Sequence, residues 1–296
     1  MQILRTAAIE ARLRLTAPIR RQQLQQLCQD GGAPMSVLFY HRVADTHPND
    51  WTISRDEFKR HVDYCCEHFR LVGLDEVQRR AASNFSADPT VTFTFDDGYA
   101  ENVEFALPYL AENNVPCVYF VTVGNVQNQT PFPHDVQAGT PLAVNTAGQL
   151  REAAELGIEI GLHTATHVDF ATADDPQTLQ REVHDAKDAL EQMIGRAVRY
   201  FAVPFGLPEQ LTPNVVSAAQ KAGLSGFCSA YGAYNFPGQD AFHLRRIHGD
   251  PDFARLRNWL TYDARKVKIQ PIVPPCVPLA GVLNPVPVNT PLTITD

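Results

Sequence analysis

Residues 91–99 read VTFTFDDGY, an apolar and threonine run that ends in two adjacent carboxylates, a glycine and a tyrosine. The alternation over residues 91–95 predicts a buried strand, and Gly98 allows a tight turn after it. Two neighbouring carboxylates with no basic residue beside them repel each other. A purely structural segment would have little reason to keep Asp96 and Asp97 together, so the pair suggests the hypothesis that a bound cation offsets the repulsion.

Around this stretch, short apolar runs alternate with helical patterns from Ser36 onward. The patterns predict strands at 36–41, 91–95, 116–123, 158–162, 199–204, 226–230 and 243–247, and helices at 54–69, 101–113, 146–157, 175–194, 212–224 and 251–265. Such alternation implies parallel strands with helices outside them, which means a doubly wound sheet or a (β/α) barrel. In a barrel, reactive side chains lie where strands end and loops begin.

Ionisable residues fall at several of these strand ends, which are occupied by His41, Asp96 with Asp97, Gly124, His163, Pro204 and His248. His163 and His167 are four residues apart, so a helical turn there would direct both imidazoles to one side. An isolated pair of this spacing is usually two ordinary surface histidines. Together with an aspartate from another strand end, the pair predicts a two-histidine, one-carboxylate metal site, most suited to Zn²⁺ but open to Co²⁺, Ni²⁺ or Fe²⁺.

Composition narrows the function classes. The 296-residue chain has a net charge of −8, which argues against a general nucleic-acid binder. Its six cysteines show no CxxC spacing, so neither a zinc knuckle nor a disulfide framework is indicated. No apolar run approaches the ~20 residues of a membrane span, and the expected location is cytoplasmic.

The sequence divides into three parts. We expect an N-terminal helical extension at 1–35, a catalytic domain at 36–266 and a proline-rich C-terminal tail at 267–296. Within residues 1–21, five arginines stand against Glu10 alone. Peripheral contact with an anionic membrane is one interpretation of this segment; a solvated helix is the preferred one, because the apolar face looks narrow.

These residues resemble a known family, the polysaccharide deacetylases with the NodB homology domain (carbohydrate esterase family four). TFDDGY matches the first motif of the family, HTATH matches the second, H-[ST]-x-x-H, and FAVPFG is similar to the third, R-x-P-[YF]. The resemblance implies a distorted (β/α) barrel of the TIM-barrel-like type over residues 36–266.

The resemblance also implies roles for individual residues. Asp97, His163 and His167 would be the metal ligands, and Asp96 the general base that takes a proton from a water molecule. The backbone N–H of Tyr99 would stabilise the oxyanion that forms when an N-acetyl group of an amino sugar is hydrolysed.

Three departures from the family pattern stand out. Ala202 replaces the arginine that opens the third motif, and Arg245 and Arg246 are the nearest candidates by chain position to serve in its place. The usual L-x-x-H is absent, and LRRIH suggests His248 as the general acid, against the alternative of a structural histidine. A fourth motif, D-x-x-D-W, is not found.

The expected partner is a carbohydrate, in exopolysaccharide or cell-envelope metabolism. The predicted substrate contacts are Tyr99, Pro204, Phe205, His41, His134, Asp135 and Arg246. Two alternatives stay open: a deformylase or amidase that acts on a lipid-linked sugar or small amide with the same metal site, and a catalytically weak carbohydrate-binding barrel. The sequence leaves the oligomeric state open.

Overall fold

A computed structural model describes residues 2–268 of the chain. Its strands are β1 (Met35–Tyr40), β2 (Arg42–Val43), β3 (Thr52–Ile53), β4 (Arg70–Leu71), β5 (Thr90–Phe95), β6 (Cys117–Val121), β7 (Glu159–Leu162), β8 (Tyr200–Ala202), β9 (Gly226–Cys228), β10 (His243–Leu244) and β11 (Arg246–His248). Each predicted strand corresponds to one or two of these. Most of the predicted tail, 267–296, lies outside the described residues, so its structure is not addressed.

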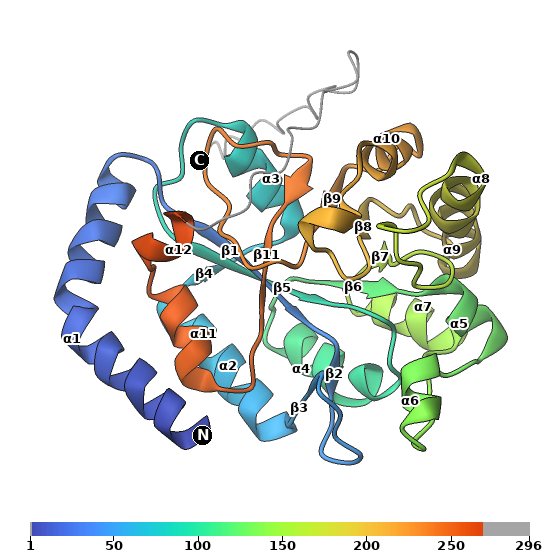
Figure 1. Cartoon of the computed structure of the whole chain (residues 1–296), viewed down its shortest axis with the longest axis horizontal. Coiled ribbons are helices and arrows are strands. Elements are labelled where there is room, and N and C mark those ends of the chain that lie inside the picture. The colour runs from blue at the N-terminus through green and yellow to red at the C-terminus, as the bar shows by residue number, and fades with distance from the viewer. Residues whose placement is uncertain (1, 269–296) are drawn as a thin grey trace, which may run out of the picture.

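The strands form a nearly closed parallel barrel in the order β10-β9-β8-β7-β6-β5-β1-β11 (Figure 1). Arg245 alone separates β10 from β11, and this one extended stretch pairs with β9 through Leu244 and with β1 through Ile247. It therefore joins the two ends of the strand order. The expected distorted (β/α) barrel is confirmed.

Helices surround the barrel (Figure 1). They are α1 (Gln2–Gln29), α2 (Arg55–His68), α3 (Leu74–Ala82), α4 (Leu107–Glu112), α5 (Val123–Asn128), α6 (Pro133–Gln137), α7 (Ala147–Glu155), α8 (Pro176–Leu179), α9 (Ala186–Ile194), α10 (Pro213–Lys221), α11 (Phe253–Leu260) and α12 (Ala264–Lys268). The predicted start signals hold, because Thr146 and Gln149 form a reciprocal capping box and Asp175 caps α8. In residues 2–268, no helix is both long and apolar enough to cross a bilayer.

The predicted helices at 101–113 and 175–194 are each interrupted by a π-helical segment, η1 (Asn102–Ala106) and η2 (Gln180–Asp185). A short 3₁₀ turn, η3 (Pro208–Gln210), precedes α10. Single π turns inside α-helices are rare and often lie at functional sites.

The barrel interior is packed with alternate residues of the strands. Met35, Val37, Phe120, Tyr200 and Cys228 are all buried there. Because successive strand residues point to opposite faces, a polar residue that follows the same alternation must find its partner inside the barrel.

Candidate metal centre

Asp96 directly follows β5 and forms a buried two-point ion pair with Arg246 of β11. The guanidinium donates from Nη1 to Oδ1 at 2.6 Å and from Nη2 to Oδ2 at 2.8 Å. Both side chains are nearly inaccessible, and the guanidinium also lies 4.8 Å from the ring centre of Phe39. A bidentate arginine fixes a carboxylate in position as well as in charge.

In this pair, Arg246 takes the place of the arginine that is missing from the third motif. Arg246 reaches Asp96, whereas Arg245 bonds Gln239 and the carbonyl of His243. The predicted role of Arg246 as a substrate contact was wrong, because its fully buried guanidinium is used by Asp96 and by the carbonyl of Ser229.

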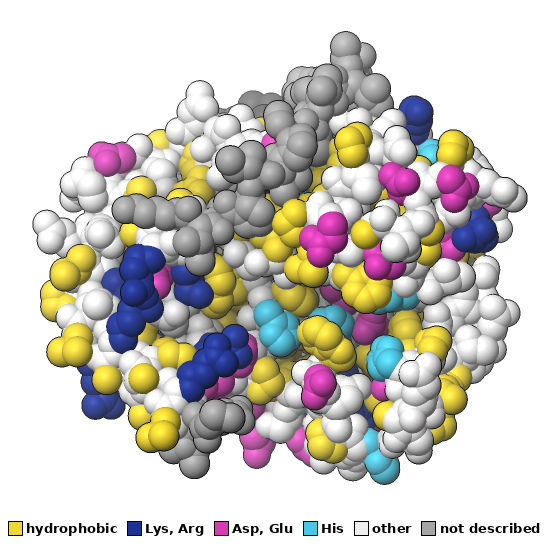
Figure 2. All heavy atoms as spheres, in the orientation of Figure 1, with side chains coloured by type: hydrophobic (Ala, Val, Ile, Leu, Met, Phe, Trp, Pro, Cys, Tyr) yellow, Lys and Arg dark blue, Asp and Glu magenta, His cyan; other side chains and the backbone are white. Residues whose placement is uncertain are grey.

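Asp97 and the two histidines of the second motif converge beside this ion pair. Potential ligand atoms of Asp97, His163 and His167 all lie within 4.8 Å of one another. Oδ1 of Asp97 is 3.5 Å from Nε2 of His163 and 3.6 Å from Nε2 of His167. Figure 2 shows histidine and acidic side chains gathered around a hollow near the middle of this face.

His163 is oriented by a backbone group of the neighbouring strand. Its Nδ1 donates to the carbonyl oxygen of Ala202 at 2.8 Å, which leaves Nε2 directed toward Asp97. A second hydrogen bond of this kind fixes the tautomer and the ring orientation of metal-ligating histidines. Ala202 therefore contributes through its main chain at the position where the family has an arginine.

The chain does not make the helical turn that was considered for His163 and His167. The chain here is a loop in which Thr164 and His167 have φ of 65° and 58°. His167 N–H donates to Oγ1 of Thr164 at 2.9 Å, and the left-handed backbone, not helical spacing, brings the second imidazole to the first.

Glu182 from the π-helical segment η2 holds this loop. Its carboxylate accepts from the N–H of Ala165 at 3.1 Å and of Thr166 at 2.9 Å, and from the Thr166 hydroxyl at 2.9 Å. The loop also runs so close to Gly124 that a Cβ on that glycine would lie 2.6 Å from the Ala165 carbonyl oxygen. Sequence analysis missed Glu182, since its only signal was a glutamate within a long amphipathic helix.

Four of the eight non-glycine residues with positive φ among the described residues border this site. They are Asp97, Thr164, His167 and Phe205, with φ between 58° and 75°. Such conformations cost about 1–3 kcal/mol each and persist where the surroundings enforce them. Their concentration here indicates that the fold holds these side chains in place at the expense of backbone stability.

The electrostatics separate the two aspartates from His167, whereas Asp96 and Asp97 outweigh burial and raise the pKa of His163. Burial would raise the pKa of Asp97, but the imidazoles of His163, His41 and His167 keep that pKa below its usual value. Burial acts likewise on Asp96, where the charge of Arg246 lowers the pKa. Burial lowers the pKa of His167 to about 4, with a contribution from His163. Both carboxylates are thus ionised and His167 is neutral at neutral pH, the states that metal binding requires.

A divalent cation fits this donor set. Oδ1 of Asp97 is buried and has no hydrogen-bond partner within residues 2–268, which is costly for a carboxylate oxygen unless a cation faces it. Two imidazole nitrogens and one carboxylate oxygen are a ligand combination typical of metals that retain open positions.

His41 and His248 lie together with Trp51 at the edge of the site. The ring of His41 is 4.7 Å from Trp51 and 6.2 Å from His248, and Trp51 is about half exposed. Burial lowers the pKa of His248 to about 4, and the neighbouring His41 adds to that shift. Trp51, which sequence analysis did not single out, belongs to a loop that carried no distinctive pattern.

The remaining predicted contacts divide by exposure. Phe205 is half exposed and its ring lies 5.0 Å from that of His167, next to the buried Pro204. His134 is exposed, with Nε2 3.0 Å from the Tyr99 hydroxyl. Asp135 as a substrate contact was wrong, because its carboxylate is buried and accepts from the Tyr99 hydroxyl at 2.9 Å.

The Tyr99 side chain is also fully buried, so only its main chain could serve a substrate. Tyr99 faces Val144 in an antiparallel bridge whose hydrogen bonds are made by Ala100 to Ala143 and by Asn145 to Gly98. In such a non-hydrogen-bonded pair, the N–H of Tyr99 points away from Val144.

Comparisons with known proteins agree with this geometry. The family model described as polysaccharide deacetylase matches residues 84–227. YxkH of Bacillus subtilis, whose name assigns it provisionally to the polysaccharide deacetylases, is 24% identical over 226 residues, 74% of this chain and 72% of that protein. IcaB from Ammonifex degensii has a similar structure, with 25% identity and a TM-score of 0.62 over 77% of this chain and 97% of that one. A de-N-acetylase from Aggregatibacter actinomycetemcomitans shares the fold at 21% identity, with a TM-score of 0.63 over 77% of this chain and all of that one.

Proposed function

Because residues 84–227 match the family model described as polysaccharide deacetylase, we propose that this protein is a metal-dependent hydrolase that removes the N-acetyl group from an amino sugar in a poly- or oligosaccharide. The observation that carries the proposal is the cluster of Asp97, His163 and His167, with its unpartnered buried carboxylate oxygen, beside the ion-paired Asp96. The de-N-acetylase with a similar fold supports the choice of an amide over an ester.

Asp97, His163 and His167 would hold the metal. When bound there, a divalent cation such as Zn²⁺ would supply positive charge that polarises the acetamide carbonyl and lowers the pKa of a nearby water. Near the buried ligands, Phe205 and Trp51 are exposed aromatic side chains, and a sugar ring could pack against them.

Asp96 acts as the general base in this mechanism. Its carboxylate accepts a proton from the attacking water, and Arg246 holds it in one orientation while it does so. The water oxygen then bonds to the carbonyl carbon, and the N–H of Tyr99, which points away from Val144, donates to the oxygen that becomes negative.

The amide C–N bond breaks once the nitrogen gains a proton. We assign this proton to His248, which lies beside His41 and Trp51 at the edge of the site. Burial lowers the pKa of His248 to about 4, so its imidazole must first take up a proton before it can donate one to the nitrogen. Acetate and the free amino sugar are the products. The site residues of this scheme are equally compatible with a formyl group or a small amide, which the test below distinguishes.

The test combines elemental analysis of protein purified without a metal-chelating tag with acetate release from N-acetylglucosamine oligomers, with and without chelator. About one metal per chain and chelator-sensitive acetate release are expected. Bound metal without acetate release would indicate that the protein hydrolyses another amide or binds carbohydrate without cleaving it. Absence of metal would show that Asp97, His163 and His167 do not form a metal site.

A further inference from the structure

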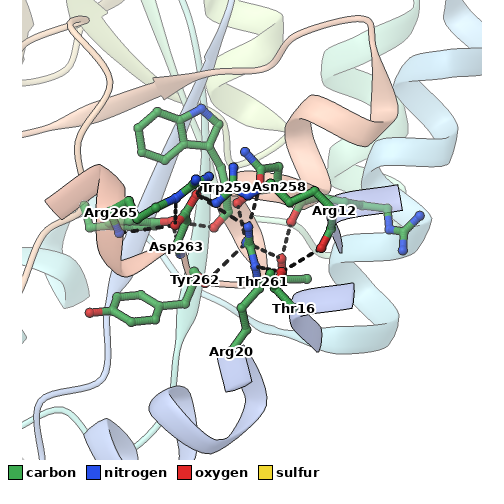
Figure 3. A network of polar contacts seen from close by, with 11 residues as sticks. Arg12, Thr16, Arg20, Asn258, Trp259, Thr261, Tyr262, Asp263 and Arg265 are labelled. Carbon is green, nitrogen blue, oxygen red and sulfur yellow. Dashed lines mark hydrogen bonds and ion pairs between the residues drawn. The ribbon is translucent and has the colours of Figure 1, made fainter. Parts of the chain in front are cut away.

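The first helix, α1, is bound to the barrel by one face only. Arg12 donates to Asp263 at 2.6 Å, and Arg20 donates to Asn258 at 2.8 Å (Figure 3). Leu13 of the same helix is buried. Glu10 pairs with Arg257 of α11 at 3.0 Å. These contacts fix the rotation of α1 about its own axis, and the opposite face is therefore turned to solvent.

That outward face carries an apolar stripe. Its members recur every three or four residues, which places them on one side of a helix. Leu4 is 76% exposed, Leu15 81% and Ile19 59%, and they rank among the most exposed large apolar residues of the described chain. Exposed alanines at positions 8 and 11 continue the stripe between Leu4 and Leu15.

Arginines border the stripe on both sides. At 3.6 residues per turn, Arg5 falls along one edge and Arg14 and Arg21 along the other. All three side chains are exposed, and none makes an ion pair or hydrogen bond to residues 2–268. The apolar stripe therefore has cationic side chains along both edges, while the side of α1 that faces the barrel is held mainly by polar contacts.

We propose that this outward face of α1, with the apolar stripe and Arg5, Arg14 and Arg21, binds the surface of an anionic phospholipid bilayer. An apolar stripe between cationic side chains matches the boundary between acyl chains and negatively charged headgroups. The charge is local: residues 2–29 contain five arginines and one glutamate, while the chain as a whole carries −8.

A second copy of the chain fits this surface less well than a bilayer does. If two copies packed through the stripe, the bordering arginines of both helices would lie close together, and their like charges would repel each other. Anionic headgroups instead offer a partner to each of these arginines. The catalytic residues all come from the barrel, so membrane binding can succeed or fail independently of the proposed function.

The test is co-sedimentation of the full chain with vesicles of equimolar phosphatidylglycerol and phosphatidylcholine, compared with pure phosphatidylcholine. We expect binding to the anionic vesicles that weakens as salt is added. Leu15→Ser with Ile19→Ser should weaken partitioning at least about tenfold, because two apolar side chains lose their burial in the bilayer. Arg14→Glu with Arg21→Glu should weaken it comparably.

Two matched controls separate this surface from general effects. Leu156→Ser removes a 54% exposed leucine elsewhere, and Arg70→Glu with Lys221→Glu makes the same change in net charge away from α1. Both controls should bind as the unmodified protein does. Absence of binding to anionic vesicles, or equal loss in the controls, would overturn the proposal. If the protein does not bind vesicles but sediments as a dimer, and Leu15→Ser with Ile19→Ser makes it a monomer, the stripe would be assigned to contact with a second copy instead.

Discussion

Arg246 of the last barrel strand holds Asp96, at the end of β5, through two hydrogen bonds of 2.6 and 2.8 Å, although 150 residues separate them in the chain. Removing the guanidinium would leave Asp96 buried with its charge uncompensated. Breaking a buried pair in this way costs about 3–5 kcal/mol of stability.

Arg246→Lys keeps a positive charge but loses the two-point geometry. We expect deacetylase activity to fall about a hundredfold, since small misplacements of a catalytic group have effects of that order. The pKa of Asp96 should rise relative to that in the unmodified enzyme, so the acid limb of the rate profile should move to higher pH. Arg245→Ala is the matched control because Arg245 does not reach Asp96. Equal rates and profiles in Arg246→Lys and unmodified enzyme would contradict the positioning role.

The two adjacent aspartates should differ in what they control. Asp96→Asn is expected to retain metal and lose about 100- to 10,000-fold in turnover, because it removes the general base. Asp97→Ala and His163→Ala should lose both metal and activity. Elemental analysis alongside acetate release separates these outcomes, and full activity in Asp96→Asn would remove the assigned base.

Glu182 is predicted to matter through the loop that carries His167. Glu182→Ala leaves three donors of Ala165 and Thr166 without an acceptor. Calorimetric titration of Zn²⁺ into metal-free protein should show affinity reduced by about 10- to 100-fold, as is typical when support for a ligand is lost. Glu191→Ala, on the same helical stretch but bonded to Lys187 and Val198, should leave the affinity unchanged. Unchanged affinity in Glu182→Ala would mean that the loop holds its shape without it.

His248→Ala tests the assigned general acid. Turnover should fall at least about tenfold while metal content stays constant, because proton transfer to the leaving amine is slowed. His68→Ala, an exposed histidine on α2, serves as the control. If turnover in His248→Ala equals that of the control, the proton comes from another group, and His41 becomes the next candidate.

Stability should fall as the pH drops below about 6.5. Burial lowers the pKa of both His61 and His243 to about 3 in the folded protein. Between an unfolded pKa of about 6.5 and the folded value, the unfolded chain binds protons that the folded chain excludes. Each residue therefore costs on the order of 1 kcal/mol at about pH 5.5. Chemical unfolding at several pH values gives the free energy of unfolding as a function of pH. This free energy should fall less steeply with decreasing pH in His61→Phe than in His68→Gln. Identical pH dependence in the two variants would show that His61 is not a source of the acid sensitivity.

Local sequence determined the barrel and the ingredients of the site. The repeated strand and helix patterns depend on side-chain periodicity, which neighbouring residues set, and they placed Asp96, Asp97 and His163 at strand ends. What local pattern could not supply was the partner of Asp96, because Arg246 reaches it only when the stretch 243–248 closes the barrel between β9 and β1.

The tertiary structure also decided how the histidines meet. Their four-residue spacing suggested a helical turn, but the carboxylate of Glu182 and the left-handed backbone at Thr164 and His167 produce the convergence instead. In the same way, the contacts of Arg12 and Arg20 with α11 and the residues after it decide which face of α1 remains exposed. Periodicity specifies elements, whereas contacts between residues far apart in the chain specify which side chains share a site, because those contacts exist only once the chain has closed on itself.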